Sequence, residues 1–164
     1  MAVKKAWMKG FGFGLTSGII TTLGMMVGLN AGTHSKVAVI GGILLIAIGD
    51  SLADAMAVHV SEESIRGKND GLKDVWVATF STLIFKVIFA SIFVIPVLTL
   101  PLDTAIFVSI AFGVFLISVF SYLFAVKQKV SAWHVVFEHL AITCLVILLT
   151  YLVGTFVNSY FGGA

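Results

Sequence analysis

The sequence predicts an all-α integral membrane protein, and three features of its composition predict that class. Hydrophobic residues make up 59% of the 164 positions, charged residues only 11%, and the mean hydropathy is +1.10. A soluble domain has about a quarter charged residues, and with this composition it would expose large apolar patches. Long runs of Leu, Ile, Phe and Ala with only two prolines favour helices over an alternating β-barrel. We therefore expect one transmembrane domain over residues 1–164.

Five apolar runs reach the length of about 20 residues that a helix needs to cross the hydrocarbon core. The first run is too long for a signal peptide, whose apolar region has about 7–15 residues, so we expect an uncleaved span. Pro96 and Pro101 bracket the turn after the third run. The only sizeable polar connection is the segment 61–74, SEESIRGKNDGLKD. The predicted spans are residues 10–31, 37–60, 75–98, 104–126 and 133–157.

The basic residues predict the orientation. Lys and Arg collect in cytoplasmic loops, and eight of the ten here fall on one side of a five-span arrangement. We expect the N-terminus in the cytoplasm and the C-terminus outside, in a plasma (inner) membrane. Lys36 lies in an opposite loop, where we expect it to be solvated, and no feature predicts a nucleic-acid partner. The eight basic residues are Lys4, Lys5, Lys9, Arg66, Lys68, Lys73, Lys127 and Lys129.

Small residues recur at intervals of four along the first span. This spacing lets the backbones of membrane helices approach closely. It fits a tight contact within the chain and a dimer seam equally well, and a homodimer is one of our expectations. The lone Cys144, in an apolar run, is expected to be a small packing residue. The glycines of the two rows are Gly10, Gly14, Gly18, Gly24, Gly28 and Gly32.

Three charged residues fall at membrane depth, where a charge costs several kcal/mol. Asp50 and Asp54 are four residues apart in the second span, so they share one helix face. Lys86 lies about eleven residues into the third span, at roughly the depth of Asp50 with a rise of about 1.5 Å per residue. We predict an Asp50–Lys86 pair and no basic partner for Asp54.

Other ionisable side chains fall near the predicted depth of Asp54. Carboxylate oxygens and imidazole nitrogens suit Mn²⁺, Fe²⁺ or Zn²⁺, and a methionine biases a site towards softer metals. A divalent-cation site is one interpretation, with Asp54 as the central ligand and Glu62 at its cytoplasmic mouth. The further candidates for the ion pathway are Asp50, Met56, His59, Glu138, His139 and, as a neutral oxygen, Ser17.

Two other interpretations stay open for the same residues. Asp54, Glu138 and His139 can form a proton relay, because a buried carboxylate holds its proton more tightly and His titrates near neutral pH. They can also be hydrogen-bonded polar residues that only specify packing, in a membrane scaffold or assembly partner. Ser51 and Asp54 are three apart but complete no catalytic triad, so an enzyme is not expected.

Several stretches resemble the vacuolar iron transporter family. GLTSGIITTLGMMVGLNAG (14–32) resembles its first helix, and HVSEES (59–64) resembles the end of its second. FASIFVIPVL (89–98) and TYLVG (150–154) resemble its third and fifth helices. The resemblance implies a five-helix dimer that moves Fe²⁺ or Mn²⁺ out of the cytosol in exchange for protons, with no tightly bound cofactor.

The resemblance also defines four departures. Ser17 stands where the family has an aspartate, and Asp54 stands where it has a functional methionine. Val58 replaces a glutamate, and the cytoplasmic metal-binding insertion is reduced to the segment 61–74. The carboxylate for a cation is therefore expected on the second span rather than the first.

Overall fold

The computed structural model describes residues 2–66 and 71–162, and every regular element there is a helix. Five stretches are long and apolar enough to cross a membrane, which confirms the predicted number. Part of the predicted polar connection, residues 67–70 with Lys68, lies outside the described residues. The five stretches are Val3–Thr33, Lys36–Ile65, Leu72–Thr99, Leu102–Gln128 and Ala132–Phe161.

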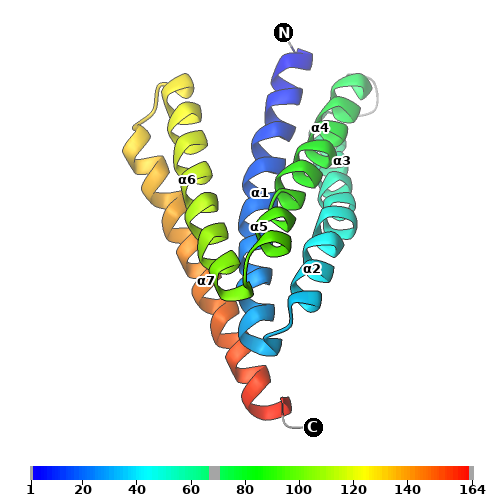
Figure 1. Cartoon of the computed structure of the whole chain (residues 1–164). Coiled ribbons are helices and arrows are strands. Elements are labelled where there is room, and N and C mark those ends of the chain that lie inside the picture. The colour runs from blue at the N-terminus through cyan, green and yellow to red at the C-terminus, as the bar shows by residue number, and fades with distance from the viewer. Residues whose placement is uncertain (1, 67–70, 163–164) are drawn as a thin grey trace. The chain divides into compact units, whose positions relative to one another are not determined.

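The helices extend beyond all the predicted limits, by eight residues at the start of the first span. Figure 1 shows their arrangement within each unit. Two of the five stretches are not continuous α-helices. In chain order the elements are α1 (Ala2–Thr33), α2 (Lys36–Leu45), the π-helix η1 (Ile46–Asp50), α3 (Ser51–Arg66), α4 (Leu72–Ser91), α5 (Val94–Thr99), α6 (Leu102–Gln128) and α7 (Ala132–Phe161).

The third stretch breaks between α4 and α5 because of a proline. Pro96 lies inside α5, where it has no N–H to donate to the carbonyl of Ile92, and its ring crowds that carbonyl. The chain turns at Ile92 and Phe93 as a result. Pro101 stands directly before α6, a position where a missing N–H is tolerated.

The chain forms two compact units, and α1 contributes to both. The first unit comprises Met1–Ile19 and Ile43–Ile92, and in it α3 packs along α4 (Figure 1). The second unit comprises Ile20–Gly42 and Phe93–Ala164, and in it α6 packs along α7.

The first glycine row lies against α4 within the first unit. A Cβ on Gly14 would come 2.6 Å from the carbonyl oxygen of Thr82, and one on Gly18 would come 3.2 Å from that of Lys86. A Cβ on Gly14 would overlap the α4 backbone and one on Gly18 would be unusually tight, so these glycines let the two backbones approach closely. This row therefore serves packing within the chain, one of the two predicted alternatives.

The second glycine row lies against α7 within the second unit. A Cβ on Gly28 would come 3.1 Å from the carbonyl oxygen of Thr150, and one on Gly32 would come 3.3 Å from that of Gly154. Gly154 is itself tight, since a Cβ there would come 2.2 Å from the carbonyl oxygen of Gly28. Because the chain's own helices fill both rows, neither row is an argument for a dimer.

Replacing Gly14 by alanine should destabilise the first unit. The added methyl group would overlap the α4 backbone, and overpacking of this kind costs about 1–3 kcal/mol. Gly41→Ala is the matched control, because a Cβ there meets nothing within 4 Å and alanine favours a helix by up to about 1 kcal/mol. Reversible unfolding by SDS in mixed micelles measures both variants. Equal stability of Gly14→Ala and the native chain would contradict the close packing of α1 on α4.

Candidate functional site

Lys86 is the centre of the charged residues at membrane depth. It lies on α4 and its side chain is 0% exposed. Its Nζ donates to Oδ2 of Asp50 at 2.5 Å, so the predicted Asp50–Lys86 pair is present. Nζ also donates to Oδ2 of Asp54. We call Asp50, Asp54 and Lys86 the charge cluster.

The prediction that Asp54 lacks a basic partner is wrong. Besides the bond from Lys86, its Oδ2 accepts a hydrogen bond from the Ser17 hydroxyl on α1 at 2.6 Å. The depth comparison placed Lys86 level with Asp50, but the ammonium lies at the end of a long side chain and reaches both carboxylates. Ser17, named as a neutral oxygen for an ion pathway, donates a hydrogen bond to Asp54 instead.

The π-helix sets the position of the two carboxylates. Asp50 is the last residue of η1, and the neighbouring Ser51 donates its hydroxyl to the carbonyl of Ile46 at 3.1 Å. A π-turn inserted in an α-helix changes the direction of the side chains on either side of it, and such turns are frequent at functional sites. Gly49, inside η1, is not required by packing, because a Cβ there meets nothing within 4 Å.

The glycine row of α1 makes room for the buried lysine. A Cβ on Gly18 would lie 3.4 Å from Cγ of Lys86, so the aliphatic part of the lysine side chain packs against the α1 backbone at this glycine. Ser17, the residue before Gly18, then reaches Asp54. Two neighbouring residues of α1 therefore act on the cluster: Gly18 packs against the Lys86 side chain, and Ser17 donates a hydrogen bond to Asp54.

The members of the cluster differ in exposure. The Lys86 side chain is fully buried, whereas the side chains of Asp50 and Asp54 are 40% and 24% exposed. With all three groups ionised, two carboxylates and one ammonium carry a formal charge of −1. The cluster therefore has one carboxylate in excess of its ammonium.

The predicted metal ligands of the fifth span remain a prediction, because they lie in a different unit from Asp54. Glu138 and His139 belong to the second unit, whereas Asp54 belongs to the first. Glu138 is exposed, and Nδ1 of His139 is 2.7 Å from the Ser121 hydroxyl. Within residues 2–66 and 71–162, no three or more His, Cys, Asp or Glu side chains are grouped to hold a metal ion. The proposed ligand set is thus without support.

The other candidates on α3 have partners of their own. Nδ1 of His59 is 3.0 Å from the Thr79 hydroxyl, and its ring lies 4.5 Å from that of Trp76. Glu62, proposed for the ion mouth, is buried and forms an ion pair with Lys9. Met56, the third candidate on α3, is 53% exposed on the helix surface.

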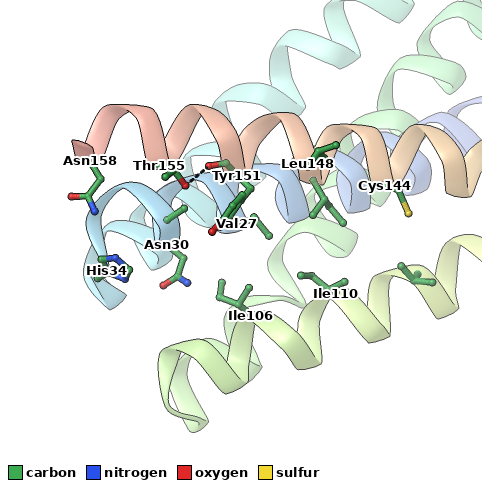
Figure 2. A pocket seen from close by; sticks show the side chains of 13 residues that line it. Val27, Asn30, His34, Ile106, Ile110, Cys144, Leu148, Tyr151, Thr155 and Asn158 are labelled. Carbon is green, nitrogen blue, oxygen red and sulfur yellow. Dashed lines mark hydrogen bonds between the residues drawn. The ribbon is translucent and has the colours of Figure 1, made fainter. Parts of the chain in front are cut away.

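Two sequence expectations outside the cluster need correction. Lys36 was expected to be solvated, but its Nζ donates to the carbonyls of Leu98 at 3.3 Å and Leu100 at 3.1 Å, which caps α5. Cys144 was expected to be a small packing residue, but it is exposed and lines a cavity of the second unit (Figure 2).

The charge cluster was predicted only in part, because residue spacing predicted the Asp50–Lys86 pair but not the bond from Lys86 to Asp54. The spacing of Asp50 and Asp54 and the depth of Lys86 were available signals, and the length of a lysine side chain could have extended the pair to three residues. The π-turn carries no local motif that predicts it. No protein-family model, no curated protein and no solved structure matches this chain, so the residues and their geometry are the basis for any function.

Proposed function

We propose that this chain is a proton-coupled cation transporter in which the charge cluster holds the exchanged proton. The observation that carries the proposal is a buried ammonium shared by two partly exposed carboxylates in spanning helices. An exposed carboxylate is costly in hydrocarbon, so its open side needs water, an ion or another polar group. Ionisable groups in such segments are characteristic of proton and ion pathways.

The surroundings of the cluster contain few other charges. On α1, no residue from Gly10 to Thr33 is ionisable, and between Val75 and Ser91 of α4 the only charge is Lys86. The next titratable groups along α3 are His59, held by Thr79 and Trp76, and Glu62, paired with Lys9. Uptake of a proton or cation in this part of the unit is therefore assigned to Asp50 and Asp54.

Fe²⁺ and Mn²⁺ are the substrates that we propose to test first. They are the ions implied by the family resemblance, and both accept carboxylate ligands. Lys86 occupies the position between the carboxylates, so a metal would have to replace its ammonium on at least one of them. In the metal-free protein a proton on one of the two carboxylates would balance the excess charge, and it would leave as the metal binds, which couples the two movements.

The assembly and orientation also belong to the proposal. Eight of ten basic residues lie on one side of a five-span arrangement, which supports a cytoplasmic N-terminus in a plasma (inner) membrane and export from the cytosol. A homodimer rests on the family resemblance alone, since both glycine rows are used within the chain.

A scaffold without transport is the second candidate, and the complete pairing of Lys86 favours it. The two functions differ in flux. In proteoliposomes with a pH-sensitive dye inside, we expect uptake of Fe²⁺ or Mn²⁺ that needs a pH gradient and moves protons the other way. Zn²⁺, Ca²⁺ and protein-free liposomes are the controls. If no ion moves through folded protein, the transporter is excluded and the cluster serves packing.

A further inference from the structure

A groove of about 530 Å³ lies in the first unit between α1 and α4. It extends along α4 from Lys73 to Phe85, which is about 18 Å at a rise of about 1.5 Å per residue. Half of a hydrocarbon core of about 30 Å is about 15 Å, so the groove has the length of one leaflet. None of its described lining residues belongs to the charge cluster, so the groove does not depend on the proposed transport.

Two tryptophans line the groove, one on each helix. Trp7 and Trp76 are about half exposed. Trp7 stacks on Phe11 and Trp76 stacks on Phe80, each with ring centroids 5.5 Å apart, so aromatic neighbours hold both rings. Tryptophans of membrane proteins gather where acyl chains meet head groups. The two rings therefore mark the end of the groove that reaches the head groups.

Two exposed lysines lie at this end of the groove, at nearly the same depth. Lys73 lines the groove on α4. A Cβ on Gly10 would come 2.5 Å from the carbonyl oxygen of Ala78, which sets the register of α1 on α4. Both helices start at the same end of the first unit (Figure 1), and Lys4 is six residues before Gly10 while Lys73 is five before Ala78. Lys4 is also three residues before Trp7, so the two share one face of α1.

The charge at this end selects an anionic ligand. No acidic side chain lines the groove within the described part of the chain. Asp74 is buried, Glu62 pairs with Lys9, and Glu63 is exposed on α3 outside the groove. In the proposed orientation this end is cytoplasmic, and basic pockets between spanning helices on that side bind anionic lipid head groups. A zwitterionic head group would instead bring its own cation to the lysines.

We propose that this groove binds an anionic phospholipid of the surrounding leaflet. The phosphate lies between Lys4 and Lys73, and one acyl chain lies along Phe80 and Ile84. Both of these apolar side chains are half exposed in a stretch that is long and apolar enough to span a membrane, so the acyl chain enters from the bilayer.

Photo-crosslinking of the whole chain in phosphatidylcholine proteoliposomes tests the proposal. One probe is a phosphatidylglycerol with a diazirine in an acyl chain, and the comparison probe is a phosphatidylcholine with the same chain. We expect the first probe to label Phe80, Ile84 or Phe85 much more strongly than the second, and unlabelled phosphatidylglycerol should compete. Glycerol phosphate, which has the phosphate without acyl chains, should not compete. Equal labelling by both probes, no labelling of the groove, or competition by glycerol phosphate would overturn the proposal.

Substitutions of single lysines locate the head group. Lys4→Gln and Lys73→Gln should each raise the phosphatidylglycerol concentration needed for half-maximal competition by about fivefold, and together by about thirtyfold. Lys5→Gln is the matched control, because Lys5 is exposed and carries the same charge next to Lys4 but lies on another face of α1. Its competition should equal that of the native chain. If Lys5→Gln shifts competition as much as Lys73→Gln, or the double variant competes like the native chain, the lysines of the groove do not bind the head group and the proposal fails.

Discussion

Lys86→Met should lower the free energy of unfolding by about 3 kcal/mol. Removing one partner of a buried ion pair leaves an uncompensated charge and costs about 3–5 kcal/mol. The lower end applies here because Asp50 and Asp54 are partly exposed and keep some solvation. Two carboxylates on one helix face would also repel each other. Reversible unfolding by SDS in mixed micelles measures the loss.

A variant without any charge in the cluster is the control for this loss. Replacing a buried ion pair by neutral groups of similar volume is often neutral or stabilising. Lys86→Met combined with Asp50→Asn and Asp54→Asn should therefore recover most of the native stability. If Lys86→Met alone is as stable as the native chain, the ammonium does not hold the two carboxylates. If the triple variant is as unstable as the single one, the loss comes from packing of the lysine side chain against Gly18.

The predicted features of the fold follow from length and spacing. A run of about 20 apolar residues has few alternatives to a spanning helix, so five helices could be predicted without any knowledge of their packing. Glycines at intervals of four predict close helix contacts, but the spacing does not say which helix they contact. The structure supplies it, with Gly14 and Gly18 against α4 and Gly28 and Gly32 against α7.

The features that could not be predicted depend on rotation about the helix axes. Depth along a span follows from counting residues, and this placed Asp50 level with Lys86 correctly. It does not give the direction in which a side chain points, so the bonds of Asp54 to Lys86 and Ser17 could not be predicted. The π-turn at Ile46–Asp50 adds a rotation that no residue spacing reveals.

Packing and transport place opposite requirements on the second carboxylate that bonds Lys86. A scaffold gains from a neutral pair, because an excess buried charge is unfavourable. A proton carrier needs a group that can be charged in one step and neutral in the next. Of the two carboxylates on Lys86, one is in excess, and this excess is what packing alone does not explain.

Asp54→Asn should abolish proton-coupled flux while leaving the fold intact. The variant keeps the Asp50–Lys86 pair, so the free energy of unfolding should change by no more than about 1 kcal/mol or increase. Flux in proteoliposomes should fall to the level of protein-free liposomes, because the remaining carboxylate of Asp50 is neutralised by Lys86 and no excess carboxylate is left to exchange a proton. Ser17→Ala is the matched control, since it removes the 2.6 Å hydrogen bond to Asp54 but keeps every charge, and its flux should decrease only in part.

Two results would contradict this expectation, each in a different way. If flux persists in Asp54→Asn and still needs the pH gradient, a residue other than Asp54 carries the exchanged proton. Flux that falls equally in Asp54→Asn and Ser17→Ala would show that the hydrogen bond between α1 and α3, rather than the excess charge, is what transport requires. Only a loss specific to the charge, in a protein that is as stable as the native chain, separates a proton carrier from a packed ion pair.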